Sequence, residues 1–208
     1  MKLYHISVYI LIALTITACG ANDSEQSTDE KVETCKYSYN EGTTKLKWTS
    51  YKYSTREPVA GTFNEITVES SANDNDPIAL IESIEFSIET NSVETENIER
   101  NGKISTLFFN VMNTPTITGN IVKLGDDGIA KVLVKMNDIE KTIEGTYTLE
   151  DNLFKFTAEI DVVNWNGEEA VNSLNTACKE LHTGEDGVSK LWSEVSISLE
   201  TKLKQDCD

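Results

Sequence analysis

Basic residues are scarce in this chain of 208 residues: 18 Lys and Arg stand against 35 Asp and Glu, which gives a formal net charge of −17. A protein that binds nucleic acid needs a basic surface, so this balance excludes that class. The same balance argues against docking on anionic lipid through overall charge. We interpret the acidity as a feature that keeps the protein soluble.

Catalytic motifs are also lacking. The sequence contains no G-x-S-x-G, no phosphate-binding loop and no nucleophile with a matched base. Acidic pairs are plentiful, as expected for an acidic chain, and none lies in a cluster that would raise a pKa for general acid catalysis. We therefore predict a protein that is not an enzyme and has no catalytic residues. The pairs are Glu94 with Glu96, Asp126 with Asp127, and Glu168 with Glu169.

Histidine is rare as well: apart from His5 near the N-terminus, the chain has only His182. Cys178 lies four residues before it, a spacing that puts both on one helix face and suits metal binding. Two ligands do not make a site, and a thiol on an apolar stripe packs as a small hydrophobe. A His at a helix C-terminus also stabilises the helix dipole. We favour the structural interpretation and predict no metal.

The one apolar run near the N-terminus, residues 6–16, is too short to span a bilayer and follows Lys2, as in a signal peptide. The next residues, Ile-Thr-Ala-Cys, match the lipobox of bacterial lipoproteins. We expect residues 1–18 to be a signal peptide and Cys19 to be lipidated and anchored in a membrane. The alternative is a plain secretory signal with a chance cysteine.

Residues 19–34 are polar and acidic after Cys19 and lack large apolar side chains, which predicts a disordered tether. Gly20 rather than Asp follows Cys19. In enterobacteria this favours the outer membrane, with the domain facing the periplasm or else the cell surface. Residues 35–208 then form one domain.

Apolar and polar residues alternate in short segments along that domain, with tight turns between them. Such alternation is typical of antiparallel sheet with one buried face. A sandwich and a closed barrel both satisfy the pattern, and hairpin-length connections favour an up-and-down barrel of about eight strands. The expected strands are residues 45–53, 61–69, 78–90, 116–124, 129–136, 143–150, 154–162 and 192–203.

Two segments interrupt the alternation and are expected to be helical insertions. In residues 165–181, Val171, Leu174, Cys178 and Leu181 recur at helical spacing. Residues 91–119 form too long a connection for a simple meander, and long connections in compact domains are often lids or binding loops. We interpret this segment as a short helical lid over a barrel mouth, with Phe108 and Phe109 pointing inward.

Three cysteines follow Cys19 in a compartment that permits disulfides. Cys35 precedes the first expected strand and Cys207 follows the last. In a closed barrel with an even number of strands, those two ends meet on one rim. We predict a Cys35–Cys207 disulfide, with Cys178 outside it.

Polar, basic, aromatic and proline residues follow one another in a fixed order in the lid segment: Ser92, Val93, Thr95, Asn97, Arg100, Ile104, Phe108, Phe109, Pro115 and Ile117. This order resembles the signature of the YceI-like proteins, bacterial lipocalin-like barrels that bind polyisoprenoids. The chain departs from the family pattern at Asn101, where Asp is usual, and the resemblance extends more weakly from about Lys45 to Leu203. The resemblance favours a mainly β, lipocalin-like barrel over a sandwich.

Alternation and resemblance together suggest a lipid site inside the barrel. Ala130, Gly145 and Ala158 are small inward residues on successive strands, which predicts a narrow apolar tunnel for a polyisoprenoid or acyl chain and no other cofactor. Arg100 either pairs with Glu96 on the lid or meets a ligand's polar or anionic head at the barrel mouth. The alternative function is a filled barrel that binds another protein of the cell envelope. The expected ligand-binding residues are Phe86, Arg100, Phe108, Phe109, Val134, Tyr147, Phe156 and Ile160.

Overall fold

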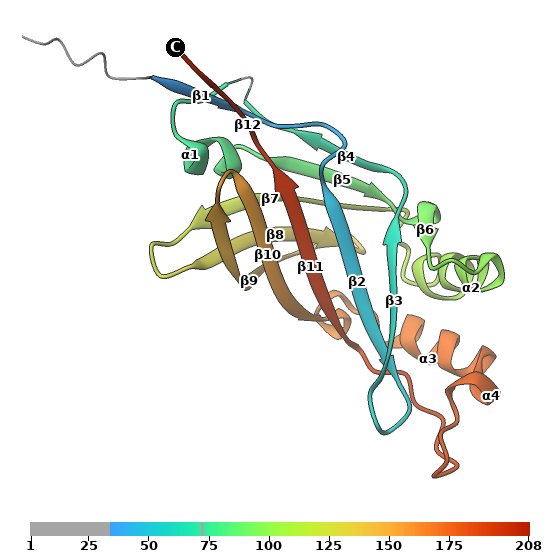
Figure 1. Ribbon diagram of the computed structural model, residues 1–208. Coiled ribbons are helices and arrows are strands. Elements are labelled where there is room, and N and C mark those ends of the chain that lie inside the picture. Colours follow the sequence, from blue (N-terminus) through green and yellow to red (C-terminus); the bar gives the residue numbers. More distant parts are fainter. Residues whose placement is uncertain (1–33, 72) are drawn as a thin grey trace, which may run out of the picture. The chain divides into compact units, whose positions relative to one another are not determined.

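The structure is a computed structural model that describes residues 34–71 and 73–208. The expected signal peptide, the lipidated Cys19 and nearly all of the expected tether lie outside the described residues. The described chain is mainly β (Figure 1). Its strands are β1 (Cys35–Ser38), β2 (Lys45–Lys52), β3 (Glu57–Phe63), β4 (Ile66–Glu69), β5 (Glu85–Glu89), β6 (Val93–Glu94), β7 (Thr116–Leu124), β8 (Ile129–Met136), β9 (Ile139–Glu150), β10 (Leu153–Asp161), β11 (Glu194–Lys202) and β12 (Lys204–Cys207).

Short helices join these strands. Within the described residues, no helix is long and apolar enough to cross a membrane. The α-helices are α1 (Pro77–Glu82), α2 (Ile98–Ile104), α3 (Glu168–Ala177) and α4 (Lys179–His182). Shorter turns are η1 (Thr90–Ser92), the π-helical η2 (Ser105–Phe109) and η3 (Val162–Trp165).

The main sheet is antiparallel, with the order β4-β5-β7-β8-β9-β10-β11-β2-β3-β6. Strands that follow one another in the chain are mostly neighbours, and β2 pairs with the late strand β11. Only Asn64 and Glu65 separate β3 from β4, which lies at the other end of the order. The sheet therefore curls into a barrel-like form (Figure 1).

The expected number of about eight strands is wrong, because the main sheet has ten. The expected strand at residues 61–69 is split at Asn64 and Glu65, whose backbone groups bond to Ser92 and Glu89 instead of continuing one ladder. The lid segment also contributes the two-residue strand β6, which pairs with β3. Both differences in strand number therefore involve residues 89–94, which lead into the lid segment.

The expected strand at residues 78–90 is wrong in its first half, where the chain forms α1. Asp76 caps this helix, since its Oδ1 accepts a hydrogen bond from the Ile78 N–H at 2.9 Å, and Pro77 takes the first helical position. Leu80 and Ile81 are fully buried in the main core. Helical insertions are therefore more numerous than the two expected.

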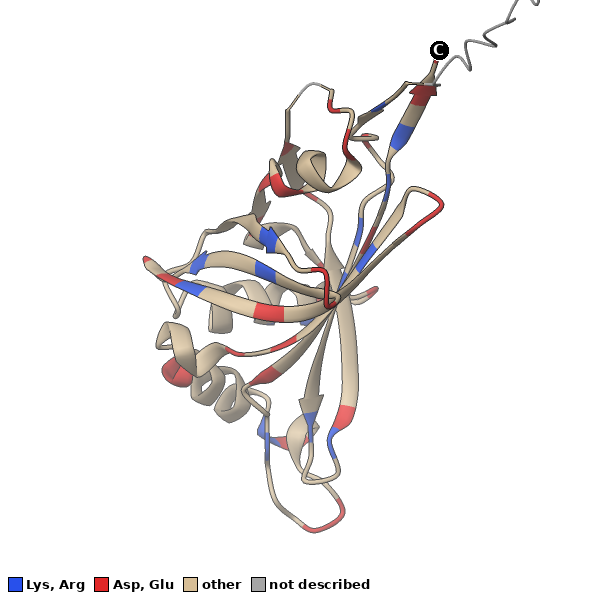
Figure 2. Ribbon diagram, turned by 90° about the vertical axis from the view of Figure 1, so that its left-hand side faces the viewer, with Lys and Arg blue, Asp and Glu red and all other residues tan. Residues whose placement is uncertain are grey.

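Burial follows the alternation closely on the central strands. On β8, Ala130, Val132, Val134 and Met136 are buried, whereas Lys131 between them is exposed. Acidic and basic residues both occur along the strands and in the loops (Figure 2). The sheet thus has an apolar inner face and a charged outer one.

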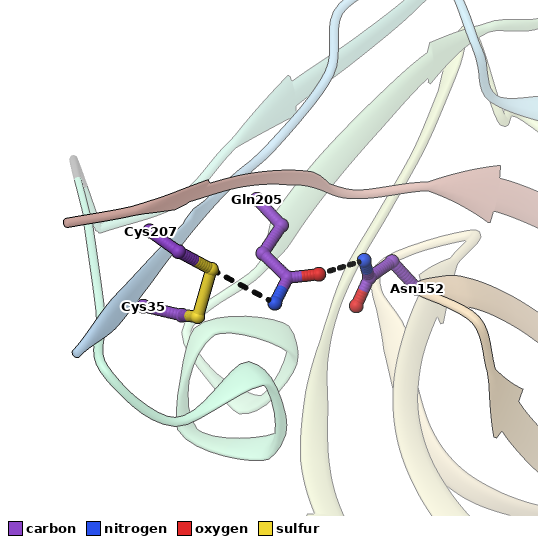
Figure 3. The surroundings of a disulfide bond; sticks show 4 residues. All are labelled: Cys35, Asn152, Gln205 and Cys207. Atoms are coloured by element: carbon purple, nitrogen blue, oxygen red, sulfur yellow. Dashed lines mark hydrogen bonds between the residues drawn. A yellow bond between two sulfur atoms is a disulfide. The ribbon is translucent and has the colours of Figure 1, made fainter. Parts of the chain in front are cut away.

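A separate two-stranded sheet pairs β1 with β12 and sets Cys35 opposite Cys207. These two cysteines form a disulfide, the pairing expected from the sequence, and Cys178 is free and buried. Beside the bond, Gln205 Nε2 donates to Cys207 Sγ at 3.3 Å and Asn152 Nδ2 donates to Gln205 Oε1 at 2.6 Å (Figure 3). The first and last strands of the domain are thereby joined.

Candidate functional site

A hollow of about 150 Å³ lies on the inner face of the sheet, and the surface that lines it is apolar. It is the inner cavity. One part of its wall is a hydrogen-bonded group: Tyr39 Oη lies 2.7 Å from Thr44 Oγ1, which donates to Thr201 Oγ1 at 3.0 Å. These hydroxyls are satisfied by one another, so the cavity offers a ligand only apolar contacts.

Aromatic rings lie over glycines on neighbouring strands around this cavity. A Cβ on Gly61 would lie 2.3 Å from Trp48 Cζ2, and one on Gly145 would lie 2.5 Å from Phe156 Cε2. Each ring fills the place of a missing side chain and lies along the sheet instead of projecting across the interior. The same relation holds for Phe86 over Gly119.

The expected tunnel along Ala130, Gly145 and Ala158 is therefore wrong, because none of these residues lines the inner cavity. The space next to Gly145 is taken by the ring of Phe156. The cavity remains open because large rings lie flat against the wall, and not because small residues line it.

A second apolar hollow, of about 130 Å³, lies under η2 and α3 and is the lid chamber. Phe108 and Phe109 of η2 and Val171 and Leu174 of α3 line it. Six side chains line both this chamber and the inner cavity, so only a single layer of side chains separates the two hollows. They are Trp48, Phe63, Ile117, Met136, Ile160 and Ile197.

The lid consists of α2 and η2, as the sequence predicted for part of residues 91–119. Asn97 caps α2 by accepting from the Arg100 N–H at 2.9 Å. Phe109 is buried with its ring centroid 5.9 Å from that of Phe63, and the Phe108 ring meets it edge-on at 5.1 Å. Both rings of the aromatic pair thus face the lid chamber, while α2 buries no side chain.

Asn101, the departure from the family pattern, ties α2 to β6. Its Oδ1 accepts from the N–H and the hydroxyl of Thr95, at 2.9 and 2.6 Å. A hydrogen bond from the Asn101 side chain, followed by one from the Glu96 N–H, lowers the pKa of Glu94. An amide can accept from Thr95 and donate to Glu94, whereas a carboxylate could only accept. Asn at this position therefore fits the acidic neighbour.

A third hollow, of about 350 Å³, lies between α2 and the chain around α4 and has a mixed polar and apolar surface. It is the mouth. Five residues line both the mouth and the lid chamber: Trp48, Ser50, Ile104, Leu174 and Leu191. The three hollows therefore follow one another from an apolar interior to a polar opening.

Cations outnumber carboxylates in the mouth, the reverse of the whole chain. Lys52, Arg100, Lys103 and His182 line it together with the single carboxylate Glu99. Lys103 Nζ pairs with Glu99 Oε1 at 2.7 Å. Within the described residues, neither Lys52 nor Arg100 has a carboxylate within 4.0 Å, and the alternative pairing of Arg100 with Glu96 does not form.

The α4 side of the mouth is held by hydrogen bonds. Lys52 Nζ donates to the Tyr53 hydroxyl at 2.9 Å and to the Leu181 carbonyl at 3.3 Å. His182 Nδ1 lies 3.0 Å from Asn175 Oδ1. Burial, and secondly the charge of Lys52, lower the pKa of His182. His182 is therefore neutral at neutral pH.

The structure distributes the expected ligand-binding residues over all three hollows. Phe86, Val134, Phe156 and Ile160 line the inner cavity; Phe108, Phe109 and again Ile160 line the lid chamber; Arg100 lines the mouth. Tyr147 lines none of these three. Its hydroxyl donates to the Gly125 carbonyl at 2.9 Å and its ring centroid lies 5.9 Å from that of Phe154. Tyr147 thus holds the β7–β8 turn.

Sequence reasoning missed Lys52 and Lys103 as members of the mouth. Lys52 ends β2 and Lys103 lies in α2, so only the fold brings them together. Lys103 follows Arg100 by three residues on one helix, which places both on one face. That spacing was the available signal for a second lid cation.

Cys178 and His182 do not share one regular helix, because α3 ends at Ala177 and α4 begins at Lys179. Cys178 is buried between them, and His182 points its Nδ1 at Asn175. Residues 34–71 and 73–208 contain no group of three His, Cys, Asp or Glu side chains placed to hold a metal ion.

Solved structures with the same fold include two at low sequence identity. A polyisoprenoid-binding domain from Saccharophagus degradans, implicated in plant cell wall breakdown, matches with a TM-score of 0.57 and 12% identity, over 83% of this chain and 99% of that one. BcnA from Burkholderia cenocepacia matches with a TM-score of 0.52 and 16% identity, over 80% of this chain and 99% of that one. At identities this low, the similarity shows a shared fold and nothing further.

A search of curated proteins finds no match. The model of the YceI-like domain, in contrast, matches residues 37–203, which include every strand of the main sheet, the lid and the three hollows. The lid segment, in which the sequence resembles the family signature, lies inside that match. The chain belongs to the YceI-like domain family.

Proposed function

We propose that this protein binds a long apolar chain, such as a polyisoprenoid or an acyl chain, inside its curled sheet and shields it from water. The observation that carries the proposal is the line of hollows: two apolar spaces separated by one layer of side chains, followed by a polar mouth. A slender amphiphile has the same order of parts. The polyisoprenoid-binding domain that shares the fold supports this choice of ligand class.

Binding draws its free energy from burial of the chain, at about 0.8 kcal/mol for each methylene removed from water. The inner cavity of about 150 Å³ is smaller than most ligand pockets, which measure roughly 300–1,000 Å³. A long chain therefore has to displace the shared wall and join the inner cavity to the lid chamber. The lid must also open for entry, as lids do in other proteins.

The proposed setting is the cell envelope. The N-terminal pattern predicts export, a lipid anchor at Cys19 and a place at the outer membrane facing the periplasm. There the barrel would store the chain or carry it across an aqueous space. In this proposal the protein is a binding protein and not an enzyme. Cys178 and His182 both line the mouth, but His182 Nδ1 is engaged by Asn175 and no hydrogen bond between described residues joins the thiol to the imidazole, as an activated nucleophile requires.

The rival function is a filled barrel whose surface binds another protein, and the small size of the inner cavity is the observation in its favour. Native mass spectrometry of the purified protein, followed by organic extraction, separates the two functions. A bound mass of a few hundred daltons that extracts as a prenyl or acyl chain is expected. A clean apo mass that stays unchanged after incubation with isoprenoid quinones and fatty acids would favour the rival.

A matched pair of variants tests where the chain lies. Val134→Phe enlarges a buried side chain that lines the inner cavity, and Val122→Phe makes the same change on β7 at a side chain that is 47% exposed. We expect the first to abolish or strongly weaken chain binding and the second to leave it unchanged. Equal binding by both variants, each folded by circular dichroism, would contradict an interior site.

A further inference from the structure

We infer that the mouth is a binding site for an anionic head group, so that the preferred ligand is an apolar chain ending in a phosphate or a similar anion. The inference rests on the proposed function, because it places the head of the same ligand whose chain occupies the interior. It names two residues, Lys52 and Arg100, as the groups that select for charge.

The mouth is rich in cationic side chains, although the chain as a whole is acidic. The chain as a whole has nearly twice as many acidic as basic residues, with a net charge of −17. The mouth has three cationic side chains, one histidine and a single carboxylate. That carboxylate, Glu99, is already paired with Lys103. The remaining positive charge lies on Lys52 and Arg100.

Lys52 and Arg100 reach the mouth from two different parts of the chain. Lys52 lies at the end of β2, in the sheet, and Arg100 lies on α2, in the lid, so two separate elements supply the cations that line the mouth. Lys52 donates only to neutral groups, the Tyr53 hydroxyl and the Leu181 carbonyl, and within the described residues Arg100 forms no salt bridge. An anion in the mouth would accept from both without breaking an existing ion pair.

The mouth adjoins the apolar lid chamber. Five residues line both the mouth and the lid chamber, and all of them except Ser50 are apolar, so a mainly apolar path leads from the interior to the cations. A free anion gains nothing from this path, whereas an amphiphile uses both ends of it. The site therefore fits the head of a lipid better than inorganic phosphate.

The head group also acts on the lid in this arrangement. An anion held by Lys52 and Arg100 links the sheet to α2, a helix that buries none of its own side chains. A charged ligand is thus expected to hold the lid closed and to leave slowly. A neutral ligand with the same chain lacks this link and is expected to leave faster.

The test compares geranylgeranyl phosphate, geranylgeraniol and inorganic phosphate on the purified protein at low ionic strength. The phosphate ester is expected to bind about tenfold more tightly than the alcohol, as charge-assisted hydrogen bonds would give. The advantage should shrink in high salt, because the mouth is partly exposed. Inorganic phosphate should bind far more weakly than the ester.

The double variant Lys52→Gln with Arg100→Gln should lose the advantage of the ester over the alcohol. Lys155→Gln, an exposed lysine on β10 outside the three hollows, is the matched control and should keep that advantage. Thermal unfolding of each variant checks that it is folded.

Each other outcome overturns a stated proposal. Equal affinities for ester and alcohol, or an advantage that survives in the double variant, would overturn the head-group site and leave the chain-binding function intact. Inorganic phosphate that binds as tightly as the ester would make the mouth a free-anion site. Failure of both prenyl compounds to bind would overturn the proposed function together with the inference.

Discussion

The end of the molecule that carries the disulfide and the end that carries the lid are built in different ways. At the disulfide end, β1 and β12 are covalently joined through Cys35 and Cys207. At the lid end, α2 buries no side chain, and Ile98 on it is 89% exposed. Segments with few buried contacts are those that open locally at low free-energy cost. The comparison therefore assigns stability to one end and access to the other.

The largest expected effect is at the disulfide end. Replacing Cys35 and Cys207 with Ser opens a loop of sequence separation 172, which should lower the free energy of unfolding by about 5 kcal/mol in the chain-entropy model. Chemical denaturation measures this loss. Chain binding by the remaining folded protein should not change. A loss of binding without a loss of stability would reverse the roles given to the two ends.

Phe109, which faces the lid chamber and is expected to act as a plug that retains a bound chain, should give the next largest effect when its ring is removed. Phe109→Ala deletes a buried ring that lines the lid chamber and is expected to cost about 3 kcal/mol of stability and to speed release of a bound chain. Ile98→Ala on the same lid is the control, with an expected change within about 0.5 kcal/mol. Denaturation and stopped-flow release measure the two quantities. Equal release rates for both variants would contradict the role of Phe109 as a plug.

A pH-dependent contact at the disulfide end should give a smaller effect. Glu82 on α1 accepts from the Leu124 N–H at 2.8 Å and pairs with Lys123 at 3.1 Å, and the backbone hydrogen bond is the main reason that the pKa of Glu82 is lowered. Glu82→Gln should cost about 1 kcal/mol at neutral pH.

The sign of this pH dependence follows from the lowered pKa. The ionised form is the stabilising one, so the contribution of Glu82 is complete above its ordinary pKa of 4.5 and is lost as the pH falls through the lower folded value. The two stability curves should therefore converge in acid. Glu150→Gln, at an exposed carboxylate on β9, is the control and should change the free energy of unfolding by less than about 0.5 kcal/mol.

The smallest expected effect concerns the tie between the lid and β6. Asn101→Asp keeps the acceptor for Thr95 but places a second carboxylate beside Glu94. Hydrogen exchange of α2 amides should become a few-fold faster at neutral pH and return toward normal in acid, where protonation removes the repulsion. Asn101→Ala should be faster at every pH. An Asp variant that behaves like the unchanged protein at neutral pH would show that Asn101 does not restrain the lid.

Much of the sheet could be predicted from the sequence, because alternation directly reports which face of a strand is buried. The strand at residues 129–136 was predicted with its bounds, and the lid was recognised from its length and its aromatic pair. The first part of residues 78–90 was predicted wrongly because a run of four apolar residues, residues 78–81, looks like a buried strand although it lies in a short helix. Asp76 and Pro77 held the helix signal that would have corrected it.

The position of the hollows could not be predicted in the same way. Gly145 was taken as a gap in the wall, but that gap is filled by the ring of Phe156, which alternation places on the same face without giving its direction. The mouth likewise depends on Lys52 and Arg100, which are far apart in the chain and meet only once the sheet has curled. Alternation predicts which face of the sheet a side chain lies on. The size and place of a cavity depend in addition on the rotamer of each large side chain on that face.

The pairing of Cys35 with Cys207 also has a mechanical consequence. Tension applied between the segments that precede Cys35 and follow Cys207 passes through one covalent bond and does not load the strands between them. The chain between the two cysteines, which includes the main sheet and its hollows, is a covalently closed loop that does not bear this tension. Under such a pull the interior keeps its shape, and a force great enough to unfold the domain must be applied elsewhere, for instance at the lid.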